Sequence, residues 1–301
     1  MKDKLLHLLC ADDMVQVCAI SARELVSEAR RIHSLSMVAT AALGRQLMMT
    51  SMMGSRLKNE SDRVSTILKG NDGYAGSMVC TAFPDAAVKG CTGDAETELP
   101  PTAEGKLDVA GYVGHTGKLT VVRDAGHGDP YVGVCNLISG EIAMDFAEYY
   151  AASEQQPSLV YLGVRVDVEN GAVRSAGGML IQPMPGCPDE VIADLTERSG
   201  RVSELSRMLD DGMTLDDAVS EILSGLSPHV TDTYEPVYRC DCSRKRIESA
   251  LLSVGRDEIE DMIKKDGGAE VSCHFCNRTY RFTGEELRTL LNAAADKSSD
   301  D

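Results

Sequence analysis

The pattern of apolar and polar residues along the first part of the chain predicts a mixture of helices and strands. Residues 36–57 contain no proline and are rich in alanine, leucine and methionine, which favours one long helix. Four methionines recur at i, i+4 spacing along this stretch, and we interpret them as core residues: Met48, Met49, Met52 and Met53. A second helix is predicted for residues 140–152, which are apolar at helical spacing.

Short apolar runs between turn residues predict strands around these helices. The predicted strands cover residues 63–68, 74–83, 108–113, 119–122, 160–168 and 172–181. The tripeptide Glu169-Asn170-Gly171 is the strongest hairpin signal in the chain. Because the connecting turns are short, we expect the strands to pair antiparallel.

The pattern changes after the motif Pro183-Met184-Pro185-Gly186, and we divide the chain there. We expect a mixed α/β core domain over 1–183, a helical linker over 184–236, a small domain over 237–296 and a disordered tail over 297–301. Within 188–226 we expect two helices, the second with Thr214 as its N-cap. This stretch has ten acidic and three basic residues, so its self-repulsion predicts marginal stability without partners.

Charge narrows the classes of function. The 301 residues include 47 acidic and 30 basic ones, a net charge of −17, which argues against binding to nucleic-acid backbones or anionic lipid. No apolar run approaches 18 residues, so no membrane span is predicted. The N-terminus carries an early acidic residue and no apolar segment ending in a cleavage site, which predicts a cytoplasmic protein.

Six of the ten cysteines stand alone in the sequence, and we assign them no role. Four lie among apolar residues and are predicted to be small buried hydrophobes: Cys10, Cys18, Cys80 and Cys135. Cys91 and Cys187 lie in stretches rich in glycine and proline, which predicts exposed thiols in loops.

The other four cysteines form a C-x-C motif, thirty intervening residues and a C-x-x-C motif: Cys240, Cys242, Cys273 and Cys276. Four thiolates match tetrahedral Zn²⁺ at about 2.3 Å per bond, although the common zinc ribbon uses C-x-x-C twice. A domain of about 60 residues usually needs a stabilising cross-link such as a bound metal. A structural zinc ion supplies roughly 10–16 kcal/mol of apparent folding free energy, against about 5–15 kcal/mol for a whole domain, so metal removal should unfold this unit.

Two interpretations of this metal site remain open on the residues alone. One is a permanent structural zinc site, with His274 as an alternative ligand to one cysteine. The other is a redox switch, because thiolates are the form that oxidants attack and each cysteine pair is close enough in sequence to form its own disulfide and eject the metal. Five bases near the cysteines either hold thiolate charge or form a solvated surface: Arg239, Arg244, Lys245, Arg246 and Arg278. Ser243 and Thr283 are predicted helix N-caps, with Glu286 completing a capping box after Thr283.

Several blocks of the chain resemble the bacterial redox-regulated 33-kDa heat-shock chaperone family. The blocks in the last part of the chain are residues 240–243, 250–255, 258–263 and 273–276. Similar blocks further upstream are residues 39–45, 153–158 and 177–186. The resemblance covers essentially the whole chain. The residue pattern and the resemblance together predict the α+β fold class: a mixed α/β core with antiparallel strand pairs, a helical linker and a small zinc-binding α+β domain.

The resemblance implies an ATP-independent holdase rather than an enzyme. In this family the reduced, zinc-bound form is inactive. The resemblance implies that oxidation would form the Cys240–Cys242 and Cys273–Cys276 disulfides, release zinc, and unfold the C-terminal unit and the linker. The exposed apolar surface then holds unfolding or oxidatively damaged client proteins, usually with homodimerisation. No nucleotide, nucleic acid or membrane partner is expected.

Two other classes of function would use the same cysteines, and one further motif, resembling a nucleotide-binding loop, is only weakly matched. A thiol-disulfide oxidoreductase would use Cys273 and Cys276, but such motifs usually lie early in a βαβ unit. A zinc-ribbon nucleic-acid module stays open because residues 239–288 contain ten bases. Residues 114–119 hint at a phosphate-binding P-loop but lack its first glycine and the Ser/Thr after the lysine, so we predict a hairpin turn there.

Overall fold

The computed structural model describes residues 2–298 of the chain and divides into two units, Met1–Arg239 and Cys240–Asp301. Of the predicted tail, Lys297 and Ser298 belong to the last helix, and residues 299–301 lie outside the described residues.

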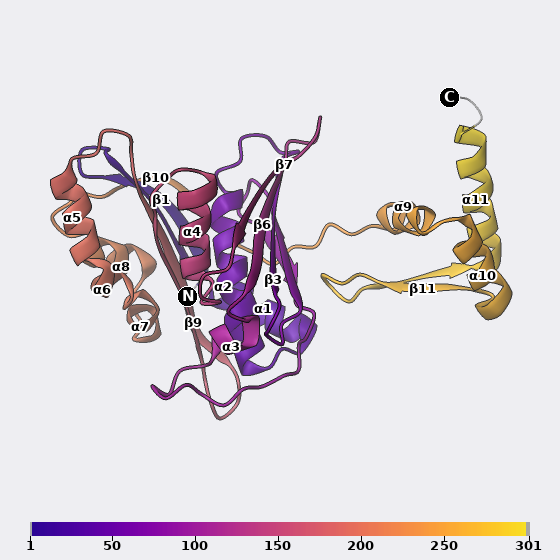
Figure 1. Cartoon of the computed structure of the whole chain (residues 1–301), viewed down its shortest axis with the longest axis horizontal. Helices are drawn as coiled ribbons and strands as arrows, with labels where there is room; N and C mark the ends of the chain where they lie inside the picture. The colour runs from indigo at the N-terminus through magenta and orange to yellow at the C-terminus, as the bar shows by residue number, and fades with distance from the viewer. Residues whose placement is uncertain (1, 299–301) are drawn as a thin grey trace. The chain divides into compact units, whose positions relative to one another are not determined.

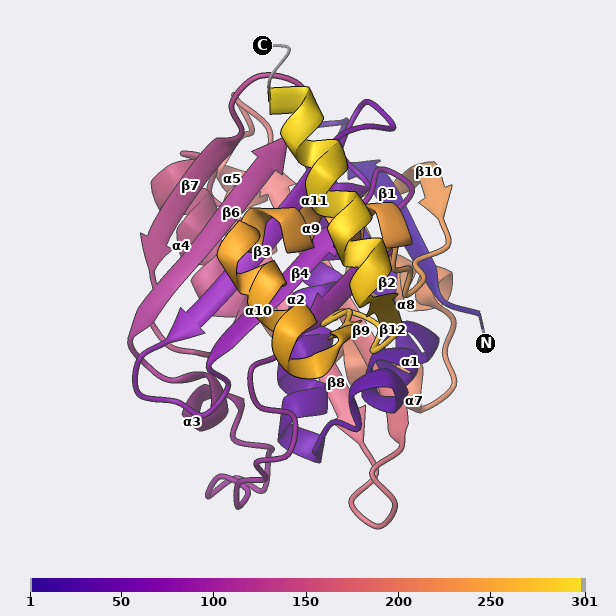
Figure 2. The same ribbon diagram turned by 90° about the vertical axis from the view of Figure 1, so that its right-hand side faces the viewer.

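The first unit contains two five-stranded antiparallel sheets (Figure 1). The first sheet has the order β10 (His229–Tyr234), β1 (Lys4–Cys10), β2 (Val15–Ser21), β9 (Val173–Pro183) and β8 (Leu159–Val166). The second has the order β5 (Val88–Cys91), β4 (Ser77–Ala82), β3 (Arg63–Gly70), β6 (Gly117–Asp124) and β7 (Tyr131–Asn136). Figure 2 shows β7, β6, β3 and β4 of this second sheet side by side.

The long helix α2 (Met37–Gly54) contacts strands of both sheets and forms the centre of the main core. All of its residues except Met37 and Arg45 are buried, which is expected of a helix that is apolar on every side. The four methionines predicted as core residues are all buried. Ser36 caps the helix by accepting a hydrogen bond from the backbone of Ala39 at 3.2 Å.

Three shorter helices complete this core: α1 (Arg23–His33), α3 (Val109–Val113) and α4 (Ala143–Ser153). The predicted strand at 108–113 was wrong, because Asp108 caps α3 by accepting a hydrogen bond from Gly111 N at 2.8 Å. The predicted hairpin turn at 114–119 is consequently a turn from α3 into β6. The other predicted strands and the helix at 140–152 are confirmed, with small differences at their ends.

The segment after Met184 forms four helices where two were predicted. They are α5 (Asp189–Glu197), α6 (Ser199–Val202), α7 (Leu205–Asp210) and α8 (Leu215–Ile222). Thr214 caps α8, as predicted, by accepting a hydrogen bond from Asp217 N at 3.1 Å. These helices pack on the face of the first sheet opposite α2 and form a second apolar core, which includes Leu6, Val17, Ile181, Leu205 and Val219.

The second unit is a small α+β domain. Its elements are α9 (Arg244–Val254), α10 (Arg256–Asp266), β11 (Gly268–Ser272), β12 (Thr279–Thr283) and α11 (Gly284–Ser298). Its core contains six buried side chains: Leu251, Ile259, Ile263, Phe282, Leu287 and Leu291. Both predicted caps are confirmed, because Ser243 accepts from Arg246 N, and Thr283 and Glu286 exchange hydrogen bonds as a capping box.

Candidate metal centre

Two short backbone segments of the second unit present the four grouped cysteines. Cys240 and Cys242 lie in the extended segment that ends at the N-cap of α9. Cys273 and Cys276 lie in the turn between β11 and β12. This turn is closed by Cys273 N donating to Arg278 O at 2.9 Å and by Asn277 N donating to Cys273 O at 2.8 Å. Asn277 has φ 56°, a left-handed conformation that asparagine tolerates well.

The four sulfur atoms lie within 4.8 Å of one another. The Sγ atoms of Cys240 and Cys273 are 3.7 Å apart, and those of Cys242 and Cys276 are 3.4 Å apart. All four residues are free cysteines. Four sulfurs around one ion at about 2.3 Å lie about 3.8 Å from each other in a regular tetrahedron, so the sulfurs of this cluster are close enough to share one tetrahedral metal ion.

Burial and hydrogen bonding shift the pKa values of three of these thiols in different directions. Burial raises the pKa of Cys242, but hydrogen bonds from Tyr280 and from the neighbouring cysteines outweigh it and bring the pKa down to about 7. The Tyr280 hydroxyl lies 3.1 Å from this sulfur. Burial raises the pKa of Cys240 and of Cys276. Of the three thiols with shifted pKa values, Cys242 is the one favoured as a thiolate, and Tyr280 is a residue of the candidate site that cysteine spacing did not reveal.

Most of the nearby bases are already paired with carboxylates. Arg239 pairs with Asp85, Arg244 with Glu286 at 2.7 Å, and Arg246 with Asp241. Lys245 is exposed and has no such pair among the described residues, and the charge of Arg278 interacts instead with Cys242 and Cys276 and with Tyr280. Thiolate charge in the cluster is thus supported mainly by Arg278 and Tyr280.

The remaining candidates from the sequence lie outside this cluster. His274 is exposed and does not belong to it. The four cysteines predicted to be buried are buried: Cys10, Cys18, Cys80 and Cys135. Cys187 is half-buried, and Cys91 is the half-buried last residue of β5 rather than part of a loop. Among the described residues, these four grouped cysteines form the only site suited to a metal by this geometry.

Comparison with known proteins gives this fold and cluster a family. The model of the family described as Hsp33 protein matches residues 3–283. The "33 kDa chaperonin" of Alkaliphilus metalliredigens is 39% identical over 292 residues, covering 97% of this chain and 99% of the relative. That of Clostridium perfringens strain SM101 is 40% identical over 303 residues, covering 100% and 95%. The crystal structure of the Thermotoga maritima 33 kDa chaperonin has a TM-score of 0.88 at 34% identity and covers 98% of this chain and 100% of its own.

These similarities define the class of protein as a chaperone. The chain belongs to the Hsp33 family. The expected α+β fold with a small cysteine-bearing C-terminal domain is confirmed. None of the helices described between residues 2 and 298 is long and apolar enough to cross a bilayer.

Proposed function

We propose that the protein is a redox-regulated, ATP-independent holdase of the cytoplasm, which keeps unfolding or oxidatively damaged proteins from aggregating. The observation that carries the proposal is the clustering of the four sulfur atoms of Cys240, Cys242, Cys273 and Cys276 within 4.8 Å of one another. In the reduced state these residues would hold one Zn²⁺. The ion would supply a cross-link between two segments and keep its ligands deprotonated.

The residues around the cluster have defined tasks in this reduced state. The turn from Cys273 to Asn277 fixes two sulfurs through its backbone hydrogen bonds. Tyr280 donates to Cys242 and stabilises its thiolate. Since the six-residue apolar core of this unit is small, holding the sulfurs together also stabilises the fold of α9, α10 and the β11–β12 hairpin.

Oxidation would convert the four thiolates into two disulfides. For each disulfide, two thiolates would give up two electrons to a peroxide, which takes up two protons from solvent and is reduced to two waters. Family resemblance favours the pairs Cys240–Cys242 and Cys273–Cys276. The sulfur contacts at 3.7 and 3.4 Å join the two motifs instead, Cys240 with Cys273 and Cys242 with Cys276. Only pairing within each motif separates the two segments, so the proposed switch requires the within-motif pairs.

Release of apolar surface would give the oxidised protein its holding activity. The helices α5–α8 cover an apolar face of the first sheet, while α2 fills the other face with an independent core. These helices carry most of a local excess of acidic residues, which opposes their packing. Their detachment would expose Leu6, Val17 and Ile181 to clients and to a second copy of the chain, with the main core intact.

The test follows zinc and client aggregation in one experiment. Reduced protein, with or without peroxide at mildly raised temperature, is mixed with a chromogenic zinc indicator and a heat-denatured client, with no ATP. We expect one zinc per chain to be released as light scattering by the client falls. Equal suppression by reduced and oxidised protein would refute the switch.

Matched variants and disulfide mapping sharpen the test. Cys240→Ser should weaken zinc retention, whereas Cys187→Ser, outside the cluster, should leave it unchanged. Mass-spectrometric mapping should find the within-motif disulfides, and cross-motif pairs would contradict the mechanism. Turnover of a disulfide substrate would favour an oxidoreductase, and salt-dependent RNA binding would favour a nucleic-acid module.

A further inference from the structure

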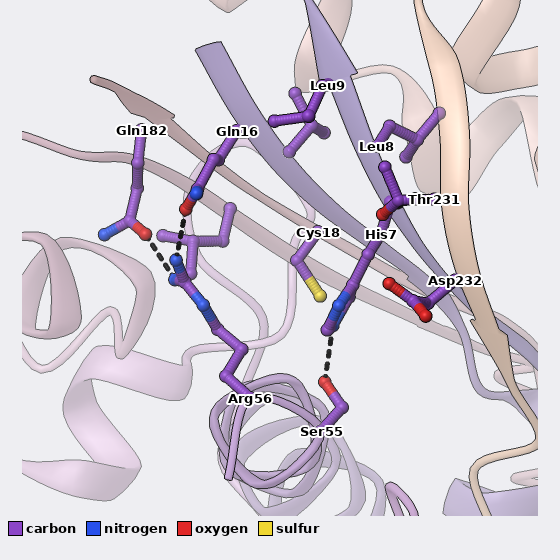
Figure 3. A pocket seen from close by; sticks show the side chains of 12 residues that line it. His7, Leu8, Leu9, Gln16, Cys18, Ser55, Arg56, Gln182, Thr231 and Asp232 are labelled. Atoms are coloured by element: carbon purple, nitrogen blue, oxygen red, sulfur yellow. Dashed lines mark hydrogen bonds between the residues drawn. The ribbon is translucent and has the colours of Figure 1, made fainter. Parts of the chain in front are cut away.

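A cavity of about 370 Å³ opens on the first sheet beyond the end of α2 (Figure 3). The helix ends at Gly54, and the two residues that follow it, Ser55 and Arg56, line the cavity. The strand register places Asp232, His7, Cys18 and Leu180 next to one another across β10, β1, β2 and β9. The row is polar at the end formed by Asp232 and His7 and apolar at the end formed by Cys18 and Leu180.

Arg56 brings a positive charge to this cavity without a carboxylate partner. Its two terminal nitrogens donate to the side-chain oxygens of Gln16, at 2.6 Å, and Gln182. Both acceptors are neutral amides, and three of the five guanidinium N–H groups remain free. Within residues 2–298 we find no carboxylate at ion-pair distance from Arg56.

Asp232 brings an unmatched negative charge to the other side. It lines the same cavity, and no cation among the described residues lies at ion-pair distance from it. Gln16, one of the partners of Arg56, lies on β2, two strands away from Asp232 on β10. Asp232 pairs with His7 and Gln16 pairs with Leu9, so the two positions are also displaced by two residues along the strands. With strands about 4.8 Å apart and a rise of about 3.4 Å per residue, the two charged ends of the cavity are separated by roughly 12 Å.

His7 lies between these charges and offers a hydrogen-bond acceptor. Its Nε2 is 2.8 Å from Ser55 Oγ, and Ser55 donates its own proton to Met52 O at 2.9 Å. Ser55 therefore accepts from Nε2–H, which leaves Nδ1 of the neutral ring unprotonated. An amide N–H located between the two charges would find this acceptor.

We propose that this cavity binds a zwitterionic peptide of about dipeptide length. Its carboxylate would bind Arg56, its peptide N–H would donate to His7 Nδ1, and its ammonium group would bind Asp232. The roughly 12 Å between the protein charges, less about 3 Å for each ion pair, leaves about 6 Å, which suits the two ends of a dipeptide and is too long for a single amino acid. The apolar floor at Leu180 and Cys18 favours an apolar side chain on the ligand.

The test uses isothermal titration calorimetry with the reduced, zinc-loaded full chain. The probes are alanyl-leucine, its C-terminal amide, its N-acetyl derivative and free leucine. We expect saturable binding of alanyl-leucine and about tenfold weaker binding of each blocked form, since each loses one charge-assisted contact. No saturable binding of alanyl-leucine, or equal binding of all four probes, overturns the proposal.

Two variants assign the ends of the ligand. Arg56→Gln should remove the effect of amidation while keeping that of acetylation, and Asp232→Asn should do the reverse. Arg23→Gln, at an exposed arginine paired with its neighbour Glu24, is the matched control and should change neither. If Arg56→Gln does not fold, the exposed Asp232→Asn decides, and an unchanged effect of acetylation in it refutes the assignment. The site lies in the first unit, so its failure leaves the proposed metal switch untouched.

Discussion

Replacing Tyr280 by phenylalanine tests the electrostatics of the cysteine cluster. The change removes only the hydroxyl that donates to Cys242 at 3.1 Å. Without this donor the pKa of Cys242, now about 7, should rise, because stabilisation of its thiolate is lost. Metal binding at neutral pH must then displace a proton more often, so the apparent affinity for zinc should fall.

The magnitude follows from the position of Tyr280. Loss of a residue that supports a metal ligand typically lowers affinity by about 10- to 100-fold. Because this side chain is only half-buried, water replaces part of the lost bond, and we expect about a tenfold loss.

The assay is zinc competition with a chelator at several pH values. The difference between the variant and the parent protein should shrink above pH 8, where Cys242 is ionised in both. Tyr74→Phe, at an exposed tyrosine of the first unit, is the control. Unchanged zinc affinity at pH 7 in Tyr280→Phe would refute the reasoning.

Three further predictions concern stability. Burial raises the pKa of Asp3 to about 6. The stabilisation that Asp3 contributes, at most about 3 kcal/mol, should therefore be fully present below pH 4 and lost as the pH rises through 6. Asp3→Asn should flatten the pH dependence of the unfolding free energy, measured by urea unfolding at each pH. Asp145→Ala should lower the free energy of unfolding in urea by about 3 kcal/mol, because the buried Asp145 side chain accepts hydrogen bonds from several backbone N–H groups. A similar loss in Asp129→Ala, at an exposed aspartate, would contradict this. Thr283→Ala should destabilise the second unit by about 1 kcal/mol through its helix cap, measured as earlier zinc release on heating, and an unshifted release temperature would count against it.

The sequence predicted long or strongly marked elements and missed short ambiguous ones. The long helix, the Asn170-Gly171 hairpin and the caps at Thr214 and Thr283 carry local signals that tertiary packing preserves. Strands β1 and β2 were not predicted, because both of their faces are buried and a continuous apolar run has no period-2 pattern. The five-residue helix α3 is too short to display a helical period.

The candidate site was predicted in its residues but not in its surroundings. Cysteine spacing alone located the four sulfurs that the fold brings together. The donor Tyr280 depends on where β12 places its side chain, and the partners of Arg239 and Arg246 depend on acids that only folding brings close. Contacts of this kind join residues far apart in the chain, so no periodic pattern in the sequence predicts them.

The spacing of the cysteine motifs also determines what each kind of bond restrains. A metal shared by both motifs closes a ring that contains the thirty residues from Ser243 to Ser272, including α9, α10 and β11. Bonds within each motif close rings with only one or two residues between the sulfurs and leave that long segment untethered. The entropy removed by closing a ring grows with its length. Bonding of the four sulfurs across the two motifs therefore restrains about half of the domain, whereas bonding within each motif restrains almost none of it.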